Sequence, residues 1–144
     1  MIRVLITFLL LVTAESYSQT QEQDYRILAL NETPIFMDID SLTEASLNDN
    51  EIHELTALVN KCVQRWNKDY PIKYVAGIQH EGRKLNDFYQ QYLPTLNKSG
   101  DKLVWITFTR KADYPDPPST LVVSTDNAFY CHCWINLTKM KILK

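Results

Sequence analysis

Residues 129–137 read FYCHCWINL, and this stretch decides how the rest of the chain is interpreted. Side chains of a β-strand alternate between its two faces. In a strand here, Cys131 and Cys133 would share an otherwise apolar row, and His132 would lie on the opposite, aromatic face. The alternation therefore predicts a central strand with the protein core on one side and an aromatic row on the other.

The Cys-His-Cys pattern argues against a metal site. A zinc ion takes three or four converging ligands. In a strand His132 points away from Cys131 and Cys133, so the three side chains do not converge. We therefore expect no metal ion, and no other cofactor.

The clearest helix signals lie between residues 48 and 71. Asn48 and Glu51 have the spacing of a capping box, in which each side chain binds the other residue's main-chain N–H. Apolar residues then recur with the helical period at positions 52, 55, 59, 62 and 66. This stripe predicts an amphipathic helix of about four to five turns. Pro71 ends it, because proline disfavours a helical conformation in the residue before it.

Outside the helix the chain reads as short strands. They are expected at residues 34–40, 72–79, 88–96 and 103–109, with a hairpin loop at 97–101 and an undecided apolar segment at 25–30. A single amphipathic helix must bury its apolar stripe, and a sheet face is the only surface available. We expect an α+β fold, with one long helix packed on an antiparallel sheet of four to five strands.

Residues 1–18 have the organisation of a secretory signal peptide. A short positive start precedes an apolar run over residues 4–12, and Ser16 and Ser18 are the small residues of a cleavage site. The run is about half of the roughly 20 residues that span a bilayer. We expect cleavage after Ser18, no membrane span, and a single mature domain over 19–144, exported to the periplasm or the extracellular space.

Export has a consequence for the three cysteines, because exported proteins meet an oxidising environment in which thiols pair. Cys62 lies on the apolar stripe of the predicted helix. A disulfide from Cys62 to Cys131 or Cys133 would join helix to sheet, close a loop of about 70 residues and contribute roughly 4 kcal/mol. The alternative, equally open at this point, is three buried free thiols that act as small apolar groups.

The composition excludes several classes of function. The formal net charge is −2, so no basic excess is available to follow a phosphate backbone, and we expect no nucleic-acid partner. Only 3 glycines are present, too few for a glycine-rich phosphate loop. His53-Glu54 lacks the second histidine of a zinc-protease helix, because position 57 is Ala57. These observations favour a non-enzymatic protein.

The aromatic side of the sheet is a candidate binding surface. In the hairpin predicted around the loop at 97–101, Leu93 falls opposite Trp105. The expected ligand or partner face consists of Tyr130, His132, Trp134, Trp105 and Leu93. Monomeric soluble proteins rarely expose an apolar face of this size to water, and such faces often mark binding sites. It predicts an unknown protein or small-molecule ligand, or a second copy of the chain in a homodimer. The alternative is that residues 25–39 cover it.

Residues 73–77 read KYVAG and resemble the Gln-x-Val-x-Gly hairpin of the cystatin protease inhibitors. Val75 and Gly77 match that motif, and Lys73 replaces its glutamine. The Pro-Trp hairpin of the family has no counterpart here. The resemblance implies a cystatin-like helix-on-sheet fold. It also implies an alternative function, inhibition of papain-type proteases through the hairpin at Val75 and Gly77.

A second resemblance covers residues 85–141. The stretches YQQY at 89–92, NKSGDKLVW at 97–105 and INLTK at 135–139 are similar to small exported bacterial proteins of unassigned function. This resemblance implies a common domain and lends no activity. Together the observations predict a non-enzymatic exported binding module of unknown ligand, with cystatin-like inhibition as the alternative.

Overall fold

The structure is a computed structural model that describes residues 24–32, 41–69, 82–122 and 131–143. The strands are β1 (Tyr25–Ile27), β2 (Thr43–Glu44), β3 (Phe88–Leu96), β4 (Lys102–Arg110), β5 (Cys131–Asn136) and β6 (Lys141–Ile142), and the α-helix is α1 (Asp49–Asp69). Short 3-10 turns lie at Leu30–Glu32, Leu85–Asp87 and Lys111–Asp113. The predicted signal peptide, the strands expected at 34–40 and 72–79, Tyr130, Val75 and Gly77 lie outside the described residues.

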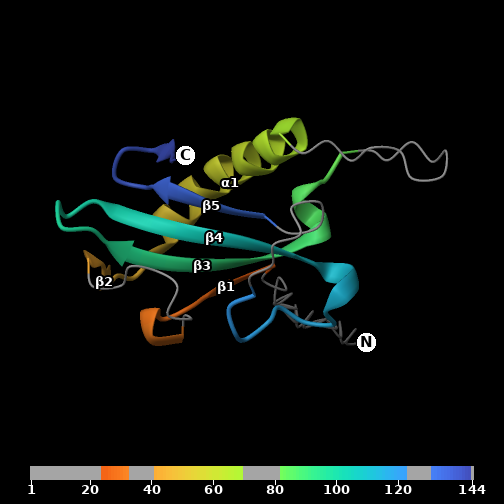
Figure 1. Cartoon of the computed structure of the whole chain (residues 1–144), viewed down its shortest axis with the longest axis horizontal. Helices are drawn as coiled ribbons and strands as arrows, with labels where there is room; N and C mark the ends of the chain where they lie inside the picture. The colour runs from red at the N-terminus through yellow and green to blue at the C-terminus, as the bar shows by residue number, and fades with distance from the viewer. Residues whose placement is uncertain (1–23, 33–40, 70–81, 123–130, 144) are drawn as a thin grey trace, which may run out of the picture.

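One sheet forms the centre of the described fold, with the strand order β1-β3-β4-β5-β6 (Figure 1). The predicted hairpin is confirmed, because β3 and β4 pair antiparallel with Leu93 opposite Trp105. Gly100 in its loop has a φ of 79°, which glycine adopts without a steric penalty. On the other side of β4, Trp105 lies opposite Trp134 of β5.

The sheet is mixed, not antiparallel throughout as predicted, and the described residues contribute six strands to it where four to five were expected. β1 runs parallel to β3, with Tyr25 opposite Gln90. β2 pairs antiparallel with the far end of the same edge, where Thr43 lies opposite Leu96. Helix α1 explains the parallel pair, because it lies between β1 and β3 in the chain. Neighbouring parallel strands need a crossover connection of this kind.

The helix begins as the sequence predicts. The Asn48 N–H donates to Glu51 Oε2 and the Glu51 N–H donates to Asn48 Oδ1, each at 3.0 Å, which confirms the capping box. The buried residues of α1 are Leu55, Leu58, Val59, Cys62, Val63 and Trp66. The helix runs for 21 residues, longer than the apolar stripe, because no helix breaker intervenes before Pro71.

The main core lies between α1 and the sheet. Trp66 packs against two phenylalanines, with ring centroids 5.2 Å from Phe88 and 6.2 Å from Phe108. Val104, Ile106 and Ile135 complete the contact from β4 and β5, and none of the three has accessible surface. The predicted α+β architecture of one helix on a sheet is therefore confirmed.

An ion pair joins the first turn of α1 to the start of β4. Lys102 Nζ donates to Glu51 Oε1 and to the Ser46 carbonyl. The hydrogen bond from Lys102 lowers the pKa of Glu51 below its ordinary value of 4.5, and the bond from the Asn48 N–H acts in the same direction. In the folded state Glu51 therefore loses its proton more easily than in the unfolded chain.

We expect this pair to make stability depend on pH. A carboxyl whose pKa is lowered by folding stabilises the protein above its unfolded pKa and loses that effect as the pH falls. The free-energy difference between wild type and Glu51→Gln, measured by denaturant unfolding, should be largest above pH 4.5 and shrink on acidification. Glu54→Gln changes the same charge at an exposed position of α1 and is the control. An equal pH profile for both variants would contradict the expectation.

The second face of the sheet is also covered, which the sequence did not predict in full. The Gln91 amide is 1% exposed and binds the loop that follows β4. Its Nε2 donates to the carbonyls of Pro118 and Thr120, at 3.0 and 2.7 Å. Its Oε1 accepts from the Val122 N–H and the Thr107 hydroxyl, at 2.9 and 3.1 Å. The described fold thus has three layers: helix, sheet and loop.

Candidate functional site

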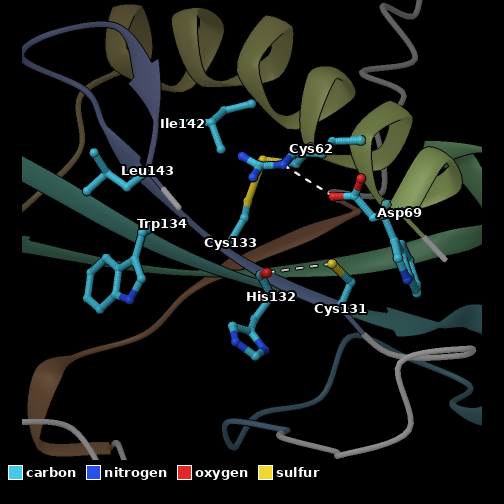
Figure 2. A pocket seen from close by; sticks show the side chains of 10 residues that line it. Cys62, Asp69, Cys131, His132, Cys133, Trp134, Ile142 and Leu143 are labelled. Carbon is cyan, nitrogen blue, oxygen red and sulfur yellow. Dashed lines mark hydrogen bonds and ion pairs between the residues drawn. A yellow bond between two sulfur atoms is a disulfide. The ribbon is translucent and has the colours of Figure 1, made fainter.

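A cavity of about 230 Å³ lies between the C-terminal half of α1 and β5, beside β6 (Figure 2). We call it the α1/β5 groove. Its lining residues are Cys62, Arg65, Trp66 and Asp69 of α1, Cys131, His132, Cys133 and Trp134 of β5, and Ile142 and Leu143 at the chain's end. The groove therefore lies beside the part of β5 that precedes its pairing with β6.

The three cysteines all line this groove. Cys62 and Cys133 form a disulfide with their Cα atoms 6.7 Å apart, so α1 is bonded to β5. This is one of the two pairings that the sequence left open. Cys131 remains a free thiol and is half-buried. Its Sγ lies 3.5 Å from the His132 carbonyl oxygen, to which it donates.

The Cys131 thiol is a weak nucleophile in this setting. Burial raises its pKa to about 11, and the nearby Arg83 guanidinium opposes this rise without cancelling it. At neutral pH the sulfur is therefore protonated, whereas nucleophilic cysteines are thiolates. Its neighbour His132 projects its ring to the opposite side of the strand (Figure 2). The arrangement does not provide a thiol-imidazole pair.

Behind the groove lies a buried arginine that the sequence analysis missed. Arg83 is 7% exposed although it follows a polar stretch of sequence, and its guanidinium lies 4.3 Å from the centre of the Trp66 ring. The Asn67 side chain binds the main chain of Arg83. Its Oδ1 accepts from the Arg83 N–H and its Nδ2 donates to the Arg83 carbonyl, both at 2.9 Å. Burial lowers the pKa of Arg83. No local sequence pattern distinguishes this residue from a surface arginine.

The outer rim of the groove is charged. Arg65 Nε and Asp69 Oδ2 are 3.4 Å apart, one helical turn from each other, and both side chains are about half exposed. Exposed pairs of this kind contribute little to stability. Their position is more informative, because each lies three residues after a buried residue of the stripe, Cys62 or Trp66. The groove therefore combines a polar rim with an aromatic and sulfur-containing interior.

The predicted aromatic face is largely covered in the structure. Leu93 and Trp105 are 1% and 5% exposed, and they form a second core cluster with Leu28. Leu30, Leu121 and Trp134 pack around this cluster. Two of its members belong to residues 25–39, as the alternative interpretation proposed, and the loop after β4 supplies another.

Leu93 and Trp105, which were expected to contact a ligand or partner, therefore have little exposed surface, because other chain segments pack over this apolar face. Trp134 stacks on Trp105 with ring centroids 5.7 Å apart, and the His132 ring meets Trp105 edge-on at 5.7 Å. His132 remains exposed and Trp134 half-buried. Only these two residues of the described face reach solvent.

Two further observations concern sites elsewhere. Within residues 24–32, 41–69, 82–122 and 131–143, histidine, cysteine and carboxylate side chains do not gather in any group of three that could hold a metal ion. Over the same residues, no helix is both long enough and apolar enough to cross a membrane. The α1/β5 groove, in contrast, brings charged, aromatic and sulfur-containing side chains together around one cavity.

No protein-family model, no curated protein and no solved structure matches the chain.

Proposed function

We propose that the protein is an exported, non-enzymatic binding module whose ligand occupies the α1/β5 groove. One observation carries the proposal: a cavity whose interior is aromatic and apolar and whose rim bears opposite charges. Concave sites with an apolar lining and a few polar groups are typical of ligand binding. The signal-peptide pattern in the sequence of residues 1–18 and the Cys62–Cys133 disulfide support export, since disulfides persist in oxidising compartments.

The chemistry of the groove supports binding over catalysis. General acid-base or nucleophilic catalysis needs a reactive group and a partner within hydrogen-bond reach. Here the free Cys131 is protonated at neutral pH, and the His132 ring is on the other side of β5. Arg65 and Asp69 satisfy each other at the rim. These groups are suited to hold a ligand and are poorly suited to transform one.

Cys131 provides a direct test, because it is the cysteine outside the disulfide and it lines the groove. We expect a bound ligand to slow its alkylation by a small maleimide, followed by intact mass. Short random-sequence peptides and small polar organic molecules are the two probe sets. A pKa of about 11 keeps the thiolate fraction low and the labelling slow enough to follow.

Two charge-reversal variants sharpen this test. Arg65→Glu changes the rim, and protection by a hit compound should weaken. Lys61→Glu makes the same charge change at an exposed position of α1 outside the groove, and protection should persist. If no compound of either set protects Cys131, or if both variants behave alike, the groove is not the ligand site.

We keep cystatin-like protease inhibition as a second proposal. It is supported by the packing of one helix on a sheet and by the resemblance of residues 73–77. The parallel pairing of β1 with β3 departs from the antiparallel sheet that this proposal expects, so the binding module is preferred. Inhibition of a papain-type protease that is lost in Gly77→Trp would favour the second proposal. Absence of inhibition at micromolar concentration would reject it.

A further inference from the structure

We infer that the partner of the α1/β5 groove is the main chain of an extended peptide, which pairs antiparallel with the open edge of β5 at His132. This inference rests on the proposed binding function and names the chemistry of the ligand. It follows from the direction in which the main-chain groups of β5 point, and not from the groove's apolar character.

The outer edge of β5 is only partly occupied among the described residues. β6 pairs with its end, where Ile142 lies opposite Ile135 and Lys141 opposite Asn136. The ladder continues by one step, because the Leu143 N–H donates to the Trp134 carbonyl at 2.8 Å. In the described part of the chain, no strand extends this pairing along Cys131–Cys133.

The main-chain groups at this open edge belong to His132. In a strand, the N–H and C=O groups of alternate residues point to the same side. The Trp134 carbonyl points toward β6, so the N–H and C=O of His132, two residues earlier, point out of the same edge. Among the residues that the structure describes, the His132 carbonyl accepts only from the Cys131 thiol, a weak donor at 3.5 Å.

An added strand would fit this edge for three reasons. It would supply one N–H and one C=O to His132 and replace the weak thiol contact with an amide hydrogen bond. It would lie in line with the pairing that β6 has begun. Its alternate side chains would point toward Trp66 and the disulfide on one side and toward the His132 and Trp134 rings on the other. Strand addition uses main-chain bonds for affinity and alternate pockets for specificity.

The test uses a blocked peptide of alternating valine and threonine and a set of the same peptide with a single N-methyl group at each position. N-methylation removes one N–H donor. We expect a methyl group on the N–H that donates to the His132 carbonyl to weaken binding up to about tenfold, and methyl groups on the two neighbouring residues to change it less than about twofold. Affinity is measured from main-chain amide shifts of Cys131–Trp134 in NMR spectra, with Cys131 protection as the second readout.

A variant of the protein completes the test. His132→Ala removes the imidazole and keeps the main chain, so the effect of N-methylation should depend on position as it does in wild type. Equal effects at all positions, with Cys131 still protected, would overturn strand addition and leave the binding function standing. No protection by any compound would overturn both. A light-scattering mass of a dimer that the peptide does not dissociate would assign the edge to a second copy of the chain and overturn the inference.

Discussion

Replacing Cys133 with serine is expected to lower the free energy of unfolding by roughly 4 kcal/mol. The Cys62–Cys133 disulfide joins residues 71 positions apart. A cross-link stabilises a protein mainly by restricting its unfolded chain, and a loop of this size corresponds to about 4 kcal/mol in the chain-entropy model. A small domain has a total stability of only about 5–15 kcal/mol. The loss would therefore be a large share of the whole.

Denaturant unfolding of three disulfide variants and one control variant checks this result. Cys62→Ser and Cys133→Ser should be destabilised alike, and the double variant should lose little more, because either substitution removes the same bond. Cys131→Ser is the matched control, since this cysteine is outside the disulfide. Reduced wild type should match the single variants. If Cys131→Ser were as destabilised as Cys133→Ser, a different disulfide pairing would be indicated.

The sequence predicted the helix and the centre of the sheet well, for identifiable reasons. The capping residues Asn48 and Glu51 act within one turn, so their spacing alone determines the contact. The strand at 88–96 was placed at its observed limits because polar loops bound it on both sides. Alternation in β5 correctly separated the core-facing Ile135 from the aromatic side with Trp134.

The features that were missed depend on contacts between distant residues. β1 has only three residues, and the direction in which it pairs is decided by β3, more than 60 positions later. Arg83 is buried because Trp66 and Asn67 of the helix meet it. Polar residues are usually exposed. Neither the pairing direction of β1 nor the burial of Arg83 produces a periodic pattern in the sequence.

Of the candidate site, the sequence indicated the strand but not the groove. Cys131, Cys133 and His132 were singled out, and all three line it. The rim residues Arg65 and Asp69 look like any surface ion pair on a helix. Leu143 escaped notice because β6 was not predicted. A groove between two elements requires their relative placement, which local patterns do not specify.

Two of the three stretches that carry the resemblance to small exported proteins, residues 97–105 and 135–139, meet at one end of the sheet. Asn136 Nδ2 donates to Asp101 Oδ2 at 2.9 Å, and the Lys102 N–H donates to the Thr138 hydroxyl at 2.8 Å. The β3–β4 hairpin is thereby bound to the turn between β5 and β6. These motif residues are accounted for by the fold, and they lie outside the residues that line the groove.

Gln91, within the stretch YQQY at residues 89–92, is the residue whose replacement should cost most after the disulfide. We expect Gln91→Leu to lower the free energy of unfolding by about 3 kcal/mol. Its amide makes four hydrogen bonds while fully buried. Leucine would leave two carbonyls, one main-chain N–H and one hydroxyl without this partner. Each buried polar group that loses its partner costs about 1–3 kcal/mol, and the loop can recover part of this by turning toward water.

The near-isosteric variant Gln91→Glu distinguishes hydrogen bonding from packing. Glutamate keeps the size of the side chain but places an oxygen against the carbonyls of Pro118 and Thr120, where the amide donated. It should therefore destabilise the protein at least as much as leucine. Hydrogen exchange of the Val122 N–H reports on the same contact, and in both variants it should become faster than in wild type. If Gln91→Leu kept wild-type stability and slow exchange at Val122, the loop would be held on the sheet by apolar contacts such as those of Leu121, and not by the Gln91 amide.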